Sequence, residues 1–371
     1  MTGLELRSTI TSSGELTLNL EEVPVPEPGP DQVVLRVEAA PINPSDLGLL
    51  FGPADPSTFR AGGTPQRPTI TASVPRERLP LVAGRLDQSM PVGNEGAGIV
   101  VKAGANAQAL LGRTVATRSP GMYAQYRLTS LADSIVLPEG TPPRDGASAF
   151  VNPFTVLAML ETMRHEGHTA IVHTAAASNL GQMLVRACLA DGVPLVNIVR
   201  SADQAALLRG IGAEHVVDST SPTFVEELTA AISATGATLA FDAIGGGTLA
   251  STILHCMEVV AVRAMTTYSR YGSNTHKQVY LYGSLDFGPT ILNRSYGMAW
   301  GIGGWLVFSY LATHGAALQQ RLAARIAAEL TTTFASTYTA EIGLAQALDP
   351  ATIAAYSKRA TGAKYLINPA R

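Results

Sequence analysis

The sequence is poor in cysteine: only Cys188 and Cys256 occur, and both stand in apolar stretches that predict helices. Two thiols so far apart argue against a disulfide framework and against a thiolate metal site. The N-terminus also lacks the basic region and apolar block that mark a signal peptide. These absences favour a cytoplasmic protein in a reducing compartment.

Charge is scarce as well, because Asp, Glu, Lys and Arg make up 15% of the residues and the formal net charge is −3. A chain without a basic excess lacks the cationic face that nucleic-acid binding requires, so we expect no nucleic-acid partner. Hydrophobic residues make up 46% of the chain, which lies outside the disordered class. The low charge suggests that part of the surface is buried against a second subunit, and we expect a homodimer.

One stretch, between Arg294 and Arg321, has no Asp, Glu, Lys or Arg at all. Its densest apolar part runs from Trp300 to Ala312 and is interrupted by glycines. A helix that crosses a bilayer needs roughly 20 apolar residues, which this part does not supply. We predict a buried or subunit-contacting helix here and no membrane association.

The length of 371 residues suits two domains. The pattern of polar and apolar residues also changes along the chain. Strand patterns separated by turns rich in proline and glycine dominate residues 1–150. From about residue 169, apolar runs alternate with helical segments, as in parallel sheets covered by helices on both faces. We predict an α/β protein with a β-rich domain at 1–150, completed by 316–371, and a doubly wound parallel sheet domain at 151–315.

The sequence also predicts the local structure of several other segments. Residues 53–92 hold many prolines and glycines, which predicts a long irregular stretch that acts as a functional lid or is disordered. A short helix is expected to begin near Ser45. Beyond residue 315 we expect a helix rich in Ala and Leu, a last helix over 337–349, and a terminal strand within 362–369.

A strand, a turn and a helix are predicted over residues 171–192. The first strand-to-helix turn of a doubly wound sheet binds phosphate, because free N–H groups and the positive end of the helix converge there. Small side chains leave the backbone reachable, and Gly181 lets the helix lie close to the strand. The G-x-G-x-x-G pattern is not met, so a merely packed corner stays open as the alternative. The candidate phosphate-binding residues are Ala175, Ala176, Ala177, Ser178, Asn179 and Leu180.

The next predicted strand ends at Arg200 and Ser201, where an acidic residue would normally bind the 2′-hydroxyl of NAD. A guanidinium can bind a 2′-phosphate through paired hydrogen bonds. This position therefore predicts NADPH as the cofactor. The alternative is that Arg200 is a solvated strand end with Asp203 as its partner.

Two further turns follow the fourth and fifth predicted strands, at the same edge of the sheet. Glycine permits a close approach of the backbone to a ligand, and a plain tight turn stays open as the alternative. We expect these turns to border the nicotinamide half of the cofactor. Their candidate residues are Ile244, Gly245, Gly246, Tyr282 and Gly283.

Several short motifs give the chain a resemblance to the medium-chain dehydrogenase/reductase superfamily, in its zinc-free quinone oxidoreductase and 2-enoyl thioester reductase branch. The motifs are "PINPSD" (41–46), "VGNEGAGIVVKAG" (92–104), "GMYAQY" (121–126), "NPFTVLAML" (152–160), "AAASNLG" (175–181), "GAEHVVD" (212–218), "FDAIGG" (241–246) and "GAKYLINP" (362–369). They occur in family order over nearly the whole chain. The resemblance implies a GroES-like catalytic domain, a Rossmann domain, and an active site in the cleft.

The resemblance also implies roles for single residues. Asn43 would orient the nicotinamide ribose or the substrate carbonyl, and Asp46 would fix its loop. Tyr123 or Tyr126 would donate a proton or a hydrogen bond, unless these tyrosines only pack. Two more residues, Asn152 and Thr155, would lie near the cofactor.

Zinc-dependent relatives carry a Cys in the first loop and a His where this chain has Asn94. Without a thiolate and an imidazole the tetrahedral site cannot be assembled, so we expect no metal. Reduction of a quinone or an activated C=C bond develops a phenolate or an enolate, which hydrogen bonds can hold without a Lewis acid. The expected function is therefore NADPH-dependent reduction of quinones or of α,β-unsaturated carbonyl compounds, which are small-molecule substrates.

Two other functions stay open. A 2-enoyl thioester reductase would meet a phosphorylated carrier through Arg76, Arg78 and Arg85, although the tyrosine that such enzymes carry shortly after the first-loop motif is missing here. A non-catalytic, crystallin-like protein would bind NADPH without turnover. The sequence leaves the physiological acceptor and the proton donor undecided.

Overall fold

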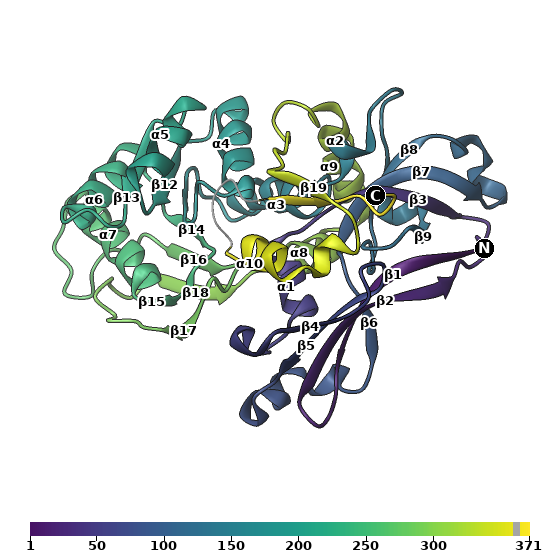
Figure 1. The fold of residues 1–371 in the computed structure, drawn as a ribbon. Coiled ribbons are helices and arrows are strands. Elements are labelled where there is room, and N and C mark those ends of the chain that lie inside the picture. The colour runs from purple at the N-terminus through teal and green to yellow at the C-terminus, as the bar shows by residue number, and fades with distance from the viewer. Residues whose placement is uncertain (359–363) are drawn as a thin grey trace. The chain divides into compact units, whose positions relative to one another are not determined.

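The computed structural model of the protein describes residues 1–358 and 364–371. These residues form two compact units (Figure 1), one made of Met1–Val151 with Ala323–Arg371 and the other of Asn152–Leu322. The first unit is rich in antiparallel strands, and the second holds a parallel, Rossmann-like sheet with helices between its strands. The predicted α/β fold class is confirmed.

In the described part of the chain, the first unit contains a five-stranded sheet of order β4-β5-β2-β1-β6. It also contains a seven-stranded sheet of order β10-β8-β7-β3-β20-β19, in which β9 pairs with β3. Residues of β1 and β2 alternate between buried and more exposed positions over much of their length, which is why these strands have one face in the core. The strands are β1 Thr2–Ile10, β2 Glu15–Pro24, β3 Gln32–Pro41, β4 Arg60–Gly63, β5 Pro68–Ser73, β6 Ser89–Pro91, β7 Glu95–Ala103, β8 Thr114–Arg118, β9 Tyr126–Ser130, β10 Ser134–Val136, β19 Ala340–Ile342 and β20 Tyr365–Ile367.

The prediction of a long irregular stretch at 53–92 is wrong in large part, because these residues contain β4, β5 and β6. β5 pairs with β2, and its Ile70 is fully buried opposite Leu18. Pro68 is the first residue of β5, a position where a strand tolerates the missing N–H. Two 3₁₀ helices, η1 Pro56–Thr58 and η2 Arg76–Arg85, connect these strands.

The parallel sheet of the second unit has the order β13-β12-β11-β14-β16-β18 over the residues described. Every neighbouring pair in it runs parallel, and β12 and β14 are buried at every position, as expected of strands covered on both faces. β15 and β17 form a separate, small parallel pair. The strands are β11 Ile171–His173, β12 Leu195–Val199, β13 His215–Asp218, β14 Leu239–Asp242, β15 Gly245–Gly247, β16 Lys277–Leu281, β17 Asp286–Thr290 and β18 Trp300–Gly304.

Helices make up much of the remaining chain. α1 begins at Pro44, one residue before the predicted start. α10 is capped by Asp349, whose carboxylate accepts the backbone N–H of Thr352 over 2.9 Å and so stabilises the first turn. The helices are α1 Pro44–Leu50, α2 Pro143–Gly146, α3 Val151–His165, α4 Asn179–Asp191, α5 Ala202–Gly210, α6 Phe224–Thr235, α7 Leu249–Arg263, α8 Val307–His314, α9 Ala316–Ala328 and α10 Pro350–Tyr356; the other 3₁₀ helices are η3 Ala105–Leu110, η4 Leu131–Asp133 and η5 Gln346–Leu348.

The helix predicted over Trp300–Ala312 is wrong in its first half. Trp300–Gly304 form β18, which pairs with β16 from Lys277 opposite Trp300 to Leu281 opposite Gly304. A Cβ on Gly301 would overlap the Gln278 side chain, so glycine suits this strand. Over the described residues, none of the helices has both the length and the apolar character that a bilayer span requires.

The helix predicted over 337–349 is also wrong in part, because Ala340–Ile342 form β19. β19 runs parallel to β20, which in turn pairs antiparallel with β3. The tail is therefore held by backbone pairing that its local pattern does not reveal. Gly362 and Ala363, at the start of the stretch predicted as the terminal strand, lie outside the described residues.

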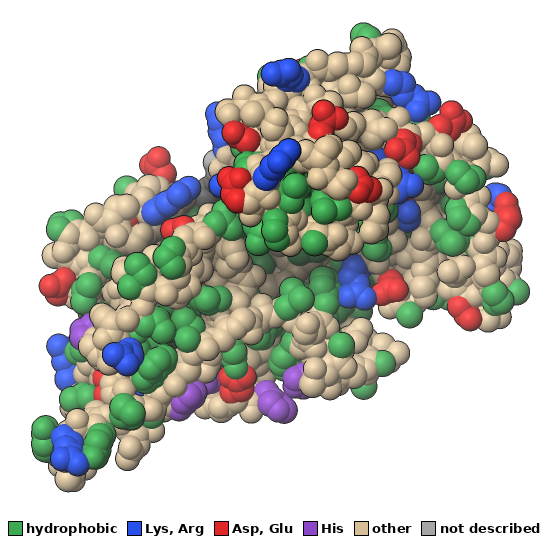
Figure 2. Space-filling model, turned by 90° about the horizontal axis from the view of Figure 1, so that it is seen from below, with side chains coloured by type: hydrophobic (Ala, Val, Ile, Leu, Met, Phe, Trp, Pro, Cys, Tyr) green, Lys and Arg blue, Asp and Glu red, His purple; other side chains and the backbone are tan. Residues whose placement is uncertain are grey.

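Charged side chains are spread thinly over the face of the molecule that Figure 2 shows. On the face seen in Figure 2, Lys and Arg stand among acidic and uncharged residues and form no extended basic area. This distribution agrees with the low charge of the composition.

Candidate functional site

The turn between β11 and α4 is shaped by close packing. Ala175 has a φ of 50°, an uncommon value for a residue with a side chain. A Cβ on Gly181 would overlap the Ala176 carbonyl oxygen, so only glycine fits there. Ala176 and Ala177 are buried, whereas Ala175, Ser178, Asn179 and Leu180 are partly exposed.

Hydrogen bonds decide which groups of this turn are available to a ligand. The N–H groups of Ala176 and Ser178 donate to Ile198 O and Ala175 O, respectively. The Ser178 hydroxyl oxygen accepts the Gly181 N–H over 3.1 Å and still has a proton to donate. A phosphate at this turn would thus meet the Ser178 hydroxyl and the positive end of the 13-residue helix α4.

Arg200 and Ser201 lie at the end of β12, as predicted. Arg200 is exposed, and its backbone N–H donates to Gln204 Oε1 over 3.0 Å. Ser201 caps α5 by accepting the Gln204 N–H over 3.3 Å. No ion pair joins Arg200 to Asp203 among the described residues, so the guanidinium is open to solvent.

The turn after β14 is organised by Asp242, a residue that the sequence reasoning missed. Asp242 is fully buried and accepts the Thr174 hydroxyl over 2.7 Å. It also accepts the N–H groups of Ile244 and Gly245, over 2.9 and 3.2 Å. Gly245 has a φ of +83°, which favours glycine. The sequence does contain a signal for this role, because Asp242 ends an apolar strand and precedes a run of glycines.

The turn after β16 approaches the one after β14. A Cβ on Gly283 would come within 2.7 Å of the Ala243 carbonyl oxygen, and Thr290 donates to Gly245 O over 2.6 Å. Gly246 is held in β15 against Asp286 of β17. The predicted residues of the two turns are therefore brought together, and glycine is required for their contact.

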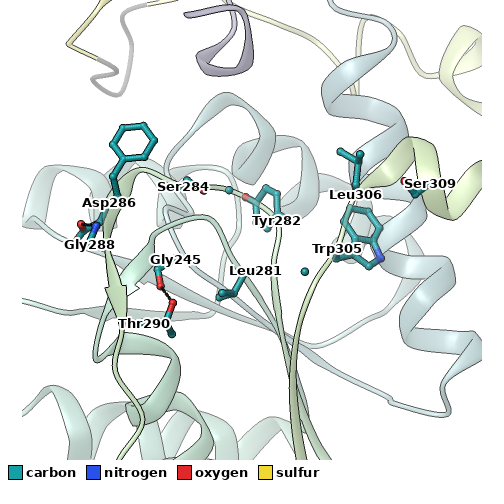
Figure 3. Close-up of a pocket in the computed structure, with 13 residues that line it drawn as sticks. Gly245, Leu281, Tyr282, Ser284, Asp286, Gly288, Thr290, Trp305, Leu306 and Ser309 are labelled. Atoms are coloured by element: carbon teal, nitrogen blue, oxygen red, sulfur yellow. Dashed lines mark hydrogen bonds between the residues drawn. The ribbon is translucent and has the colours of Figure 1, made fainter. Parts of the chain in front are cut away.

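A cavity of about 590 Å³ opens beside these turns, a volume typical of small-molecule sites. Figure 3 shows Asp286, Gly288 and Thr290 on the β17 side of it and Trp305, Leu306 and Ser309 on the other, with Tyr282 between them. Apolar surfaces from the stretch after β18 thus face polar groups from β17. The cavity is lined by Gly245, Leu281, Tyr282, Gly283, Ser284, Asp286, Phe287, Gly288, Thr290, Gly304, Trp305, Leu306 and Ser309.

His173 is a second residue whose importance the sequence did not reveal. It is fully buried at the end of β11, and its Nε2 lies 2.7 Å from the Tyr282 hydroxyl. The two rings stack with their centres 5.8 Å apart. Burial lowers the pKa of His173 to about 3, so the imidazole stays neutral.

In the first unit, Asn43 and Asp46 occupy a buried segment at the junction of β3 and α1. The Asp46 carboxylate accepts the Asn43 N–H over 2.8 Å, which fits the predicted role of Asp46 in fixing this loop. Asn43 Nδ2 donates to Glu95 Oε1 over 2.7 Å. Glu95 Oε2 also accepts the N–H groups of Phe150 and Val151, over 2.8 and 2.9 Å.

The buried carboxyls around Asn43 have altered pKa values. Burial raises the pKa of Asp46 to about 7, and burial also raises the pKa of Glu95. Lys364 opposes the shift of the Glu95 pKa by its charge, and burial lowers the pKa of Lys364 itself to about 8. The Lys364 ammonium has no hydrogen-bond partner among the residues described.

The two predicted tyrosines lie in different places. Tyr123 is fully buried, and its hydroxyl donates to Pro41 O over 3.1 Å, next to the Asn43 loop. Tyr126 is partly buried in β9, where its backbone pairs with Arg36. The structure thus brings Tyr123 together with Asn43 and Asp46 and leaves Tyr126 outside this cluster.

Asn152 and Thr155, in the second unit, lie near the start of α3. They are 9% and 5% exposed, so both are largely buried.

In the first unit, Asn94 donates to the Ser45 hydroxyl over 3.4 Å. No group of three or more His, Cys, Asp or Glu side chains that could hold a metal ion occurs among the described residues.

Known proteins resemble this chain over part or all of its length. A family profile described as zinc-binding dehydrogenase matches residues 179–269, which include neither the loop 41–46 nor Asn94. The mitochondrial enoyl-[acyl-carrier-protein] reductase of Xenopus tropicalis is 29% identical over 218 residues, covering 54% of this chain and 51% of the relative. The chain thus spans about half the length of the curated relatives it matches.

Solved structures match over almost the whole chain. A candidate NADPH:quinone reductase from Mesorhizobium loti has a TM-score of 0.73 and 26% identity, covering 99% of this chain and 98% of that one. Escherichia coli quinone oxidoreductase, solved with NADPH, has a TM-score of 0.68 and 17% identity over 100% of both chains, and it supports the fold alone. These matches support the resemblance to the medium-chain dehydrogenase/reductase superfamily, since the similar proteins include a candidate quinone reductase and an enoyl-[acyl-carrier-protein] reductase.

Proposed function

We propose that the protein is a zinc-independent, NADPH-dependent reductase of quinones or of activated C=C bonds in α,β-unsaturated carbonyl compounds. The observation that carries this proposal is the turn between β11 and α4, where Gly181 leaves room for no Cβ and the N-terminus of α4 is partly exposed. Such a turn suits a pyrophosphate. The similar Mesorhizobium loti protein is described as a candidate NADPH:quinone reductase.

The choice of NADPH rests on Arg200. Its guanidinium is exposed at the end of β12 and has no acidic partner among the described residues. A 2′-phosphate would find a cation there and no carboxylate paired with it. Ser201 and the first turn of α5 would add hydrogen bonds to the same group.

The residues of the chain supply binding and orientation, while NADPH, when bound, supplies the hydride. We propose that the turns at Ile244–Gly246 and Tyr282–Gly283 border the nicotinamide, because Gly245, Tyr282 and Gly283 line the cavity. This arrangement leaves the apolar wall of the cavity for the acceptor.

In the first unit, we propose that Asn43 orients a carbonyl or ribose oxygen. Glu95 fixes the Asn43 amide for that task. Tyr123 holds the loop through Pro41 O, so its hydroxyl is better suited to positioning than to proton donation.

The side chains at the positions of the zinc ligands do not suit zinc. The positions that the resemblance gives to zinc ligands hold no thiolate or imidazole: the first loop reads "PINPSD" and position 94 is Asn. Amides are not among the ligands that tetrahedral zinc prefers. Metal analysis of the purified protein should find no stoichiometric zinc, and one zinc per chain would contradict this part of the proposal.

A 2-enoyl thioester reductase is the second candidate, favoured by the similarity to the Xenopus enoyl-[acyl-carrier-protein] reductase. Arg76 and Arg78 are exposed and available to a phosphorylated carrier. Arg85 is not, because its guanidinium donates to Leu49 O and to the Ser8 hydroxyl, both over 2.7 Å.

The decisive experiment is an NADPH-oxidation screen that compares quinones, free enones and enoyl-CoA esters at matched concentrations. We expect turnover of quinones or free enones with a higher kcat/KM than that of the matched enoyl-CoA ester. The reverse order would favour the thioester reductase. Quenching of NADPH fluorescence on binding, without oxidation by any acceptor, would identify a non-catalytic NADPH-binding protein.

We further propose that the protein is a homodimer. Large apolar side chains are exposed in the segment from β17 to the start of α8, with Phe287 82%, Met298 77% and Leu306 58% accessible. Exposed apolar side chains concentrated in one segment are a mark of an interaction surface. Sedimentation equilibrium should give twice the chain mass, and a monomer at all concentrations would contradict the proposal.

A further inference from the structure

We propose that His173 and Tyr282 act as a pair in which the imidazole orients the tyrosine hydroxyl, so that this hydroxyl donates a hydrogen bond to a carbonyl oxygen bound in the 590 Å³ cavity. This inference rests on the proposed function, because it assigns the ligand chemistry of the same cavity. His173 is a positioning residue in this arrangement, and Tyr282 is the residue that touches the ligand.

The tautomer of His173 decides which group donates. Nε2 of His173 lies 2.7 Å from the Tyr282 oxygen, and Nδ1 is buried without a hydrogen-bond partner among the described residues. A neutral imidazole carries one N–H. If that hydrogen were on Nδ1, a buried donor would be left without an acceptor. Among buried backbone groups, donors without a partner are rarer than acceptors without one, and we infer the same order for this imidazole.

The hydrogen therefore belongs on Nε2, and it is donated to the Tyr282 oxygen. The tyrosine then has its own hydroxyl proton left, and the described residues give that oxygen no other partner. Burial raises the pKa of Tyr282, so the hydroxyl keeps its proton. Because Tyr282 lines the cavity (Figure 3), a ligand oxygen there is the acceptor that completes the pair.

A carbonyl oxygen fits this donor, because it accepts hydrogen bonds and has no proton of its own to oppose the hydroxyl. Two sources of such an oxygen exist under the proposed function: the carboxamide of the nicotinamide, and the carbonyl of the quinone or enone. Both share the chemistry of a neutral acceptor, and the second gains negative charge during hydride transfer.

The first test reads the tautomer directly and needs no turnover. Two-bond ¹H–¹⁵N correlation spectra of the protein labelled in histidine report which ring nitrogen carries the hydrogen, and His173→Gln identifies the signal. We expect the Nε2–H form in the protein without ligand. The Nδ1–H form would overturn the inference while leaving the proposed function intact.

The second test compares Tyr282→Phe with the matched control Tyr280→Phe. Tyr280 lies two residues earlier, in β16, and its hydroxyl donates to Glu166 over 2.7 Å instead of lining the cavity. If the Tyr282 hydroxyl donates to the carbonyl of the quinone or enone, Tyr282→Phe should lower kcat on the order of 100-fold and leave the Kd for NADPH unchanged. If it donates to the carboxamide of the nicotinamide, Tyr282→Phe should raise the Kd for NADPH, measured by fluorescence quenching, by about 5-fold.

Either result supports the proposed His173–Tyr282 pair, provided that Tyr280→Phe changes neither kcat nor the Kd for NADPH. Unchanged kcat and Kd in Tyr282→Phe would overturn the proposal. His173→Leu should act in the same direction as Tyr282→Phe, and His173→Gln, whose amide can still donate an N–H, should recover part of the loss. If the unaltered protein neither binds nor oxidises NADPH, the proposed function fails, and the tautomer measurement still tests the His173 arrangement.

Discussion

Asn43 and Glu95 are joined by a hydrogen bond of 2.7 Å from Nδ2 to Oε1, and neither residue is more than 3% exposed. The same carboxylate accepts the N–H groups of Phe150 and Val151 with its other oxygen. A single buried carboxylate thus ties the loop after β3 to the backbone at 150–151. The orientation of the Asn43 amide follows from this arrangement of acceptors.

Glu95→Gln should weaken this junction. An amide offers one acceptor oxygen where the carboxylate offers two, so at least one of the three N–H donors would face another donor. We expect a loss of about 1–3 kcal/mol in the free energy of unfolding, measured by urea denaturation. The control Glu139→Gln, at an exposed position, should change stability by no more than about 0.5 kcal/mol. Equal effects of the two variants would contradict the structural role of Glu95.

Asp46→Asn should change how stability depends on pH. The pKa of Asp46 is raised from 3.8 to about 7 in the folded protein, so between about pH 4 and pH 7 the folded state keeps a proton that the unfolded chain has released. Stability of the unaltered protein therefore falls as the pH rises through this window. An asparagine can still accept the Asn43 N–H but does not titrate.

The stability of Asp46→Asn relative to the unaltered protein should thus grow between pH 4 and pH 7, by up to about 4 kcal/mol. Urea denaturation at several pH values measures this difference. The exposed Asp87→Asn serves as the control and should follow the unaltered protein. Parallel profiles for Asp46→Asn and the unaltered protein would show that Asp46 is not buried as described.

Arg200→Asp tests the cofactor preference. Replacing the cation by a carboxylate removes the partner of the 2′-phosphate and adds repulsion, so the KM for NADPH should rise by about 10- to 100-fold while that for NADH changes little. Steady-state kinetics with both nucleotides gives the comparison. Arg263→Asp, at the exposed end of α7, is the matched charge reversal and should leave the ratio unaltered. An equal rise for NADPH and NADH would remove Arg200 from the 2′-phosphate site.

The sequence was informative where local pattern and tertiary structure agree. The buried apolar strands of the parallel sheet and the turn at Ala175–Gly181 could be predicted, because their signals lie within a few consecutive residues. The α/β class is confirmed, and the comparisons support the resemblance to the superfamily. The roles assigned to Asn43, Arg200 and the other candidate residues stay predictions, because they concern contacts with a cofactor or a substrate.

The sequence did not predict the secondary structure where pairing between distant segments decides it. Trp300–Gly304 is apolar and looks helical, yet β16 offers it a strand partner, and β19 forms because β20 lies beside it. His173 and Tyr282 stand 109 residues apart, and no pattern in the chain connects them. Such relationships are set by the sheet order and become visible only in three dimensions.

Gly181→Ala should disrupt the proposed phosphate turn. The new Cβ would overlap the Ala176 carbonyl oxygen, so helix α4 or the turn has to shift. We expect a loss of about 1–3 kcal/mol in stability and weaker NADPH binding, measured by thermal unfolding and fluorescence quenching. Gly210→Ala, where a Cβ meets nothing within 4 Å, should be neutral or slightly stabilising. Unchanged NADPH affinity in Gly181→Ala would argue against phosphate binding at this turn.

Lys277→Met probes a buried ion pair at the start of β16, away from the residues that line the cavity. Lys277 is fully buried and donates to Glu258 Oε2 over 2.5 Å, to Thr275 O over 2.7 Å and to the Ser273 hydroxyl over 3.1 Å. Removing one partner leaves the Glu258 charge buried and uncompensated.

We therefore expect Lys277→Met to lower the free energy of unfolding by about 3–5 kcal/mol. Lys102→Met is the matched control, because Lys102 pairs with Glu27, whose side chain is 77% exposed, and such surface pairs contribute at most about 1 kcal/mol. Urea denaturation of both variants separates the two cases. Similar losses in the two variants would mean that water reaches Glu258, since only solvent can screen a carboxylate that has lost its ammonium partner.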